Sequence, residues 1–172
     1  MSQNQPHDVP ISPAEMISIA SNTGVKKANA SSLRLLLLSI LAGAYIAFGA
    51  LFASILGTGT SGVWPYGVVK LLQGLVFSLG LILVLVGGAE LFTGNNLMII
   101  AWLDKKIKLI HLFRNWMIVY VGNFIGSILI AFAVLLSREY LAANGSLGAT
   151  MISTAVTKVN YDFGQAIILG IL

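Results

Sequence analysis

The sequence has no cysteine and few charged residues, and both facts limit the kinds of protein it can encode. Without cysteine, neither disulfide bonds nor thiol chemistry are available to the protein. Only 9% of the 172 residues are charged and 57% are hydrophobic, whereas soluble domains carry about 25% charged residues. The composition therefore indicates a polytopic membrane protein. The net charge of +4 does not indicate a nucleic-acid partner, because the basic residues stand beside apolar runs and not in a solvated patch.

Residues that usually carry catalysis or bind metals are also scarce. The two histidines, His7 and His111, have no metal-ligand spacing, so we interpret each as a surface side chain. No nucleophile–base pair is visible, and we expect neither an enzyme nor a protein that binds a metal or cofactor. The polar N-terminus lacks the apolar segment of a secretory signal. The paired Asn-Pro-Ala motifs of aquaporins are missing as well.

The N-terminal part is polar and ends in a short amphipathic segment. We expect residues 1–11 to be disordered and residues 12–30 to form an amphipathic helix on the cytoplasmic membrane surface. Ser12 supplies an N-cap, a proline follows it at the first helical position, and Glu15 comes three residues after the cap. This segment is too short and too polar to cross a bilayer. The remainder, residues 33–172, is the expected transmembrane domain.

Two uninterrupted apolar runs predict membrane-spanning helices, since about 20 residues cross the hydrocarbon. The first span is Leu35–Leu56 and the third is Trp116–Ser137, and small residues on one side of each suit close helix packing. We interpret Ser146–Asp162 as a polar connection. The apolar segment Phe163–Leu172 begins a fourth span but has only ten residues. We therefore expect the sequence to be a fragment of a longer protein.

The second span is unusual because its apolar run, Leu71–Leu103, is too long for one crossing and contains one charge, Glu90. Its middle, residues 87–96, is rich in glycine and asparagine, which makes poor lipid-facing helix. We predict a broken helix, with one half ending near Val86 and the other starting near Asn96. Such a break with an ionisable residue indicates a permeation path. A long kinked core helix with a structural glutamate is the alternative.

The distribution of lysine and arginine predicts the orientation of the chain in the membrane. The N-terminal flank and the 104–114 loop hold seven of the ten basic residues. Because cytoplasmic loops carry an excess of lysine and arginine, we expect the N-terminus and this loop to be cytoplasmic.

Several short motifs follow one another along the chain. They are Ser12–Met16, Asn22–Val25, Leu41–Ala44, Phe77–Leu81, Leu85–Gly94, Asn115–Trp116, Tyr120–Asn123 and Gly170–Leu172. In this order they resemble the formate/nitrite transporter family over residues 12–172, and together they are highly specific.

This resemblance implies an all-α membrane protein with an aquaporin-like fold, in which two inverted repeats make a six-helix protomer. It also implies a homopentamer with one pore per protomer, embedded in the inner (plasma) membrane with the N-terminus cytoplasmic. The present chain would supply the first three spans, with the second span broken, and the start of the fourth. Residues 33–172 would then be a truncated transmembrane channel domain. A histidine central to the pore would lie beyond Leu172.

The resemblance also implies roles for individual residues. Thr93 matches a threonine that bonds this histidine and faces the substrate, although from the residues alone it could equally cap the second half-helix. Lys158 matches a lysine that draws anions to the pore mouth, whereas an exposed lysine usually has no specific role. Four apolar residues match the pore constrictions, although such stripes are normally core packing; they are Phe77, Leu81, Leu91 and Phe92.

The remaining candidates are structural. We interpret Glu90 as a carboxylate that accepts backbone N–H bonds in the unwound loop, since it would repel an anion in the pore. Gly87, Gly88 and Gly94 would allow the break. Asn115 and Asn123 are expected to form interhelical hydrogen bonds.

The function implied is passage of a small monovalent anion, with formate preferred and proton coupling left open. Crossing an apolar constriction costs an anion much more desolvation than it costs the neutral acid. A pore for nitrite or hydrosulfide is the alternative, because Gly94-Asn95-Asn96 departs from the small hydroxylated residues of formate members. A neutral-solute pore and a non-transporting membrane scaffold are more distant alternatives.

Overall fold

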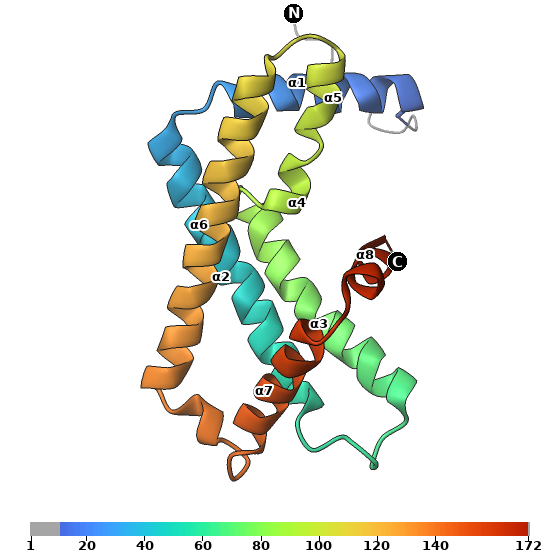
Figure 1. Cartoon of the computed structure of the whole chain (residues 1–172), viewed down its shortest axis with the longest axis vertical. Coiled ribbons are helices and arrows are strands. Elements are labelled where there is room, and N and C mark those ends of the chain that lie inside the picture. Colours follow the sequence, from blue (N-terminus) through green and yellow to red (C-terminus); the bar gives the residue numbers. More distant parts are fainter. Residues whose placement is uncertain (1–10, 172) are drawn as a thin grey trace, which may run out of the picture.

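All regular elements in the described part of the chain are helices. The computed structural model describes residues 11–171, so the segment expected to be disordered lies almost wholly outside the described residues. Three helices there are long and apolar enough to cross a membrane: α2 (Ser32–Gly57), α3 (Tyr66–Val86) and α6 (Leu109–Leu136). In Figure 1, α2 and α6 lie side by side, and α3 packs on α2.

The N-terminal helix α1 (Pro13–Ala28) lies crosswise to α6, near the N-terminal end of that helix (Figure 1). Its start is as expected, because Ser12 Oγ accepts a hydrogen bond of 3.3 Å from the Glu15 backbone N–H. Ala28 of α1 is buried in a small apolar cluster with Met98 and Ala101 of α5 (Met98–Leu103). This contact anchors α1 to the second half of the broken helix.

The spans begin earlier than the sequence predicts. α2 starts at Ser32, three residues before the expected Leu35, and α6 starts at Leu109, seven residues before Trp116. The predicted span is bounded by an apolar run, which excludes polar residues such as Asn115, so it starts too late. Asn115 is nevertheless buried inside the protein, where a neighbouring side chain satisfies it.

Small residues bring α2 and α6 into close contact. A Cβ atom added to Gly43 would overlap the backbone of Asn123, and one added to Gly126 would overlap the carbonyl group of Ile40. The hydrophobic effect does not drive helices together inside the bilayer, so close backbone packing is a main contribution to their association. The expected small-residue sides of these two spans therefore meet each other.

Glycines also allow close backbone contact between α2 and α3. A Cβ on Gly49 would lie 2.8 Å from the Phe77 carbonyl oxygen, and one on Gly80 would lie 2.8 Å from that of Tyr45. α2 is thus the central helix of the chain, with α6 on one side and α3 on another.

The predicted polar connection at residues 146–162 is largely helical, because α7 (Ser146–Val159) occupies most of it. Its polar residues do not break the helix, since hydroxyl groups donate back to carbonyls one turn earlier: Thr150 to Ser146 at 2.9 Å and Thr154 to Thr150 at 2.9 Å. The short 3-10 helix η1 (Glu139–Leu141) precedes α7. The last described element is α8 (Phe163–Ile171).

Candidate functional site

The second span is broken where the sequence predicts. α3 ends at Val86, the short helix α4 (Phe92–Asn95) lies inside the expected loop, and α5 begins at Met98 and not at Asn96. Gly88 has φ +60°, a left-handed conformation that glycine adopts without steric cost. The backbone then turns away from the axis of α3, as Figure 1 shows between α3 and α4.

The backbone groups freed by the break find partners on other helices. The Glu90 N–H donates to the Leu38 carbonyl of α2 at 3.2 Å. Asn123 of α6 donates from Nδ2 to the Glu90 carbonyl at 3.0 Å, and its Oδ1 accepts from the Phe92 N–H at 2.9 Å. In a membrane, unwound backbone is stable only when its polar groups are satisfied within the protein. The expected interhelical role of Asn123 is thus confirmed.

The carboxylate of Glu90 has a different partner from the one predicted. Lys27 of α1 forms an ion pair with Glu90 Oε2, where we expected backbone N–H groups. The two side chains are 25% and 14% exposed, respectively, so much of the pair is shielded from solvent. Loss of either partner would leave the other as an uncompensated, poorly solvated charge, which is strongly destabilising. Since Lys27 lies 63 residues before Glu90, local sequence does not reveal the pairing.

A chain of buried amides extends this ion pair to α6. Lys27 Nζ also donates to Asn95 Oδ1 at 2.7 Å, and Asn95 Nδ2 donates to Asn115 Oδ1 at 2.8 Å. Trp116 Nε1 donates to the Asn95 carbonyl at 3.0 Å. Asn95 and Asn115 are fully buried, so their hydrogen bonds are costly to break. The network ties α1, α4 and α6 together, and it confirms the interhelical hydrogen bond of Asn115.

Thr93 lies in α4, inside the break, and its side chain is exposed. Within residues 11–171, its hydroxyl forms no hydrogen bond. Gly94 is also exposed, and a Cβ there would meet no atom within 4 Å. The break therefore presents an unpaired hydroxyl beside open space.

The four apolar candidates divide into two pairs. Leu91 and Phe92 are half-buried at the break itself, and the Phe92 ring packs edge-on against Tyr120 and Trp116 of α6 at centroid distances of 5.5 and 6.4 Å. Phe77 and Leu81 are exposed residues of α3. The structure therefore brings Leu91 and Phe92 next to Thr93 and leaves the other pair further along α3.

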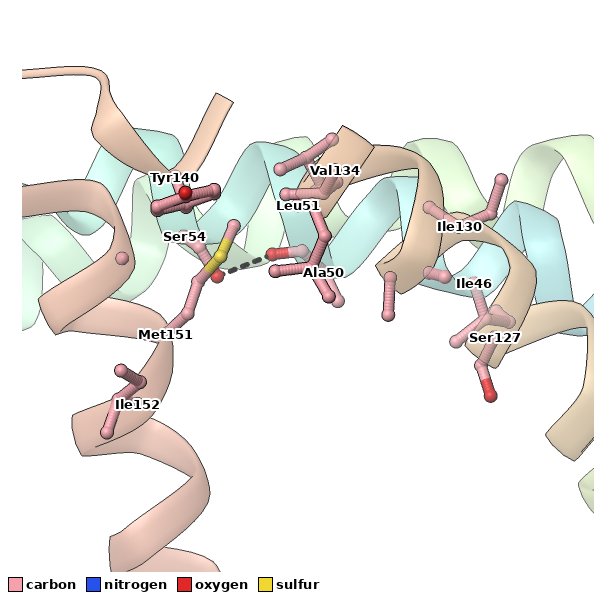
Figure 2. A pocket seen from close by; sticks show the side chains of 14 residues that line it. Ile46, Ala50, Leu51, Ser54, Ser127, Ile130, Val134, Tyr140, Met151 and Ile152 are labelled. Atoms are coloured by element: carbon pink, nitrogen blue, oxygen red, sulfur yellow. Dashed lines mark hydrogen bonds between the residues drawn. The ribbon is translucent and has the colours of Figure 1, made fainter. Parts of the chain in front are cut away.

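Lys158 is not part of this group. It is exposed in the last turn of α7, which packs on η1 and α2. A large apolar cavity of about 700 Å³ lies nearby, between α2, α6 and α7 (Figure 2). Three hydroxyl side chains line it, and those of Ser54 and Ser127 already donate to the Ala50 and Phe124 carbonyls at 2.8 and 2.9 Å, which leaves that of Tyr140 in an otherwise apolar lining. This cavity therefore offers little to an anion, whose burial needs hydrogen bonds or counter-charges.

Sequence reasoning missed Lys27 and Asn95 as parts of the site. A signal for Lys27 exists, because a lone carboxylate inside an apolar run requires a partner. The N-terminal flank contains several cations, and the sequence does not say which of them reaches Glu90.

Residues 14–172 match the family model described as formate/nitrite transporter. The chain belongs to the formate/nitrite transporter family. It is therefore a multi-pass membrane protein, and the family resemblance inferred from its motifs is confirmed.

Individual relatives agree with this assignment. The chain is 41% identical to the formate channel FocA of Escherichia coli over 172 residues, which cover all of this chain and 60% of that protein. It is 39% identical to a probable formate transporter of Methanothermobacter thermautotrophicus over 135 residues, covering 77% and 49% of the two chains. The chain thus spans about 60% of the length of the first of these relatives.

A solved structure described as a pentameric formate channel with formate bound has a similar fold. The TM-score is 0.72 at 39% identity, and the match covers 81% of this chain and 54% of that one. The all-helical family fold is therefore shown for the part that the chain spans.

Proposed function

We propose that the intact protein containing these residues is a pore for small monovalent anions, with formate preferred, assembled as a homopentamer. The observation that carries this proposal is the break in the second span, where residues of α2 and α6 hold unwound backbone beside the exposed hydroxyl of Thr93. Irregular backbone at membrane depth is characteristic of substrate paths. The similarity to a formate-bound channel supports the choice of formate.

The pore residues act in sequence in this proposal. Lys158 attracts the anion towards the mouth, the apolar side chains form the constrictions, and Thr93 offers a hydrogen bond between them. The apolar residues are Phe77, Leu81, Leu91 and Phe92. Because an apolar constriction penalises a charged solute, we propose that the anion takes up a proton there and crosses as the neutral acid. The family resemblance supplies a histidine beyond Leu172 as the proton donor.

The proposed setting is the inner (plasma) membrane, with α1 and the 104–114 loop on the cytoplasmic side. The excess of basic residues in these two segments supports this orientation. Glu90, Gly87, Gly88 and Gly94 have structural roles in this proposal, because they form and stabilise the break. We propose no catalytic activity and no cofactor for the protein.

Nitrite or hydrosulfide is the second candidate substrate, and Asn96 is the observation in its favour. This side chain is exposed beside the break, in the segment Gly94-Asn95-Asn96 that departs from the small hydroxylated residues expected of formate members. Asn95 gives no such support, because it is buried and bonded to Lys27 and Asn115.

The test is reconstitution of the intact protein in liposomes, with uptake of formate, nitrite and hydrosulfide measured side by side. We expect formate to enter fastest, and a control with empty liposomes corrects for passive leakage of the neutral acids. Faster nitrite or hydrosulfide uptake would favour the second candidate. Uptake of a neutral solute such as glycerol without anion uptake, or no uptake at all, would overturn the proposal.

A further inference from the structure

An apolar groove of about 390 Å³ lies between the start of α2 and the N-terminal half of α6. Both helices start at the same end of the molecule (Figure 1). Leu33 and Met117 in the groove are 69% and 63% exposed, so nothing in the described part of the chain covers them. The lining is apolar except for one serine, and consists of Ser32, Leu33, Leu36, Met117, Ile118 and Val121.

The end of this groove at the start of α2, its head, is close to an arginine. Arg114 is three residues before Met117 and so lies on the same face of α6. Its Nη2 donates to the Ala30 carbonyl in the linker that leads into α2, which places the guanidinium beside the start of that helix. A guanidinium has five N–H donors, and among residues 11–171 this hydrogen bond is the only one that it forms. Arg114 therefore has donors left for a ligand.

The arginines near the head of the groove have no acidic partner within the described residues. The ion pairs found there use the carboxylates of Glu90 and Asp104, and both partners are lysines. Arg114 takes part in neither pair, nor does Arg34, which follows Ser32 by two residues and is exposed. An anion at the head of the groove therefore meets positive charge that no carboxylate of residues 11–171 neutralises.

The length of α6 places Arg114 at the depth of lipid phosphates. With 28 residues, α6 is about 42 Å long, whereas the hydrocarbon core of a bilayer is about 30 Å thick. An upright, centred α6 therefore extends about 6 Å beyond the core at each end. Arg114 is the sixth residue of α6, about 7.5 Å from its start. Its backbone thus lies near the boundary of the core, from which an arginine side chain reaches the headgroups.

We propose that this groove binds an anionic phospholipid. The phosphate contacts the guanidinium of Arg114 and the hydroxyl of Ser32, and one acyl chain lies along the apolar lining. Arginine binds phosphate oxygens with paired N–H donors, and Arg34 adds positive charge that attracts anionic headgroups. A lipid matches the charged head and the apolar groove together. A spanning helix would cover the apolar lining but would bury Arg114 unless it brought a carboxylate to the same depth.

The experiment measures lipid binding to the intact protein in detergent by native mass spectrometry. The probes are phosphatidylglycerol, which is anionic, and phosphatidylcholine with the same acyl chains. Arg114→Gln is expected to lower the affinity for phosphatidylglycerol about fivefold, which corresponds to about 1 kcal/mol, and to leave that for phosphatidylcholine unchanged. Lys108→Gln is the matched control, because it removes an exposed cation just before α6 and outside the groove. Its expected effect is less than about twofold.

Ser32→Asp tests the same site while keeping the hydrogen bond from Arg114 to Ala30, so it decides the matter even if the Arg114→Gln protein does not fold. An acidic residue at the first position of a helix favours the helix, and Ser32 is exposed, so the variant should keep its stability. The new carboxylate repels the phosphate and pairs with Arg114. The affinity for phosphatidylglycerol should fall at least about fivefold, again without a change for phosphatidylcholine.

Photo-crosslinking then locates the bound lipid. Phosphatidylglycerol with a diazirine in one acyl chain is expected to label peptides that contain Leu33–Leu36 or Met117–Val121. Labelling only elsewhere would show that another part of the protein covers the groove, and would overturn the inference. Equal wild-type affinities for the two lipids, or unchanged phosphatidylglycerol binding in a folded Arg114→Gln or Ser32→Asp protein, would overturn it as well. These measurements involve no transport, so their failure would leave the proposed function intact.

Discussion

Asn123 of α6 accepts a hydrogen bond from the backbone N–H of Phe92 at 2.9 Å, across the point where the second span resumes as α4. Its amide nitrogen donates at the same time to the Glu90 carbonyl at 3.0 Å. One side chain therefore bridges the extended residue Leu91 and takes the place of the helical hydrogen bonds lost there. The shape of the break depends on α6 as well as on its own sequence.

We predict that Asn123→Ala destabilises the intact protein. The substitution leaves the Phe92 N–H and the Glu90 carbonyl without their protein partner, at a cost of about 1–3 kcal/mol for each buried group. The melting temperature in detergent should fall clearly. Ser127→Ala is the matched control one turn further along α6, because Ser127 bonds only the Phe124 carbonyl of its own helix. Equal melting temperatures for the two variants would contradict the role assigned to Asn123.

A second prediction concerns the contact between α2 and α6. Gly126→Ala places a Cβ against the backbone carbonyl of Ile40, which cannot rotate away. Overpacking of this kind typically lowers the free energy of unfolding by about 1–3 kcal/mol. Gly74→Ala in α3 is the control, since a Cβ there meets no atom within 4 Å. Thermal unfolding of both variants checks the prediction, and a Gly126→Ala protein as stable as the control would refute it.

Thr93→Val should reduce formate flux without reducing stability. The valine keeps the shape of threonine but lacks the hydroxyl, which has no hydrogen-bond partner within residues 11–171. If this hydroxyl holds the anion or the pore histidine, its loss costs about 1–3 kcal/mol, or roughly a 5- to 150-fold decrease in flux. Liposome flux and melting temperature are measured together. Normal flux with a lower melting temperature would show that Thr93 is only a structural part of α4.

The dependence of uptake on pH tests the protonation step. If the neutral acid crosses the constriction, formate uptake should increase as the external pH falls at constant total formate. The apolar side chains at the break, such as Leu91 and Phe92, are the reason to expect this, because they cannot replace the water around an anion. Uptake that follows the formate concentration alone would leave a plain anion channel.

The assembly state gives a prediction that does not depend on transport. The described helices expose many large apolar side chains, including Phe124, Leu129 and Phe132 of α6 at 60%, 54% and 57%. In the intact protein such surfaces face lipid, the rest of the protomer or other subunits. We expect native mass measurement of the intact protein in detergent to give a pentamer, and a stable monomer or dimer would contradict the proposed homopentamer.

The sequence predicts most of the spans because long apolar runs need no tertiary information. It also predicts the break, since glycines and a carboxylate at residues 87–96 cannot continue a lipid-facing helix. The sequence does not reveal that α7 is helical. This segment is as rich in serine and threonine as a polar loop, but threonine hydroxyls donate to carbonyls within the helix. The sequence also misses the short helix α4, whose four residues are too few for a periodic pattern.

The candidate site is less predictable than the fold. Glu90 is conspicuous as a lone charge, but its partner depends on where α1 lies on the folded protein. That position follows from the burial of Ala28 against Met98 and Ala101, a packing contact that no local motif encodes. Asn123 is recognisable as a polar residue in a span, whereas its backbone partners, Ser39, Glu90 and Phe92, can be identified only from the folded structure of the break.

The ion pair also has a consequence for how the protein enters the membrane. Lys27 is synthesised 63 residues before Glu90, so its ammonium group has left the ribosome before the carboxylate reaches the insertion machinery. Glu90 lies in the unwound segment after α3, so the cost of inserting it unpaired is at most the value for an acidic residue at the centre of a spanning helix, about 2.5–3.5 kcal/mol. A lysine already present at the membrane surface offsets part of that cost as soon as α3 has entered. α1 would then assist insertion of the second span before the fold is complete.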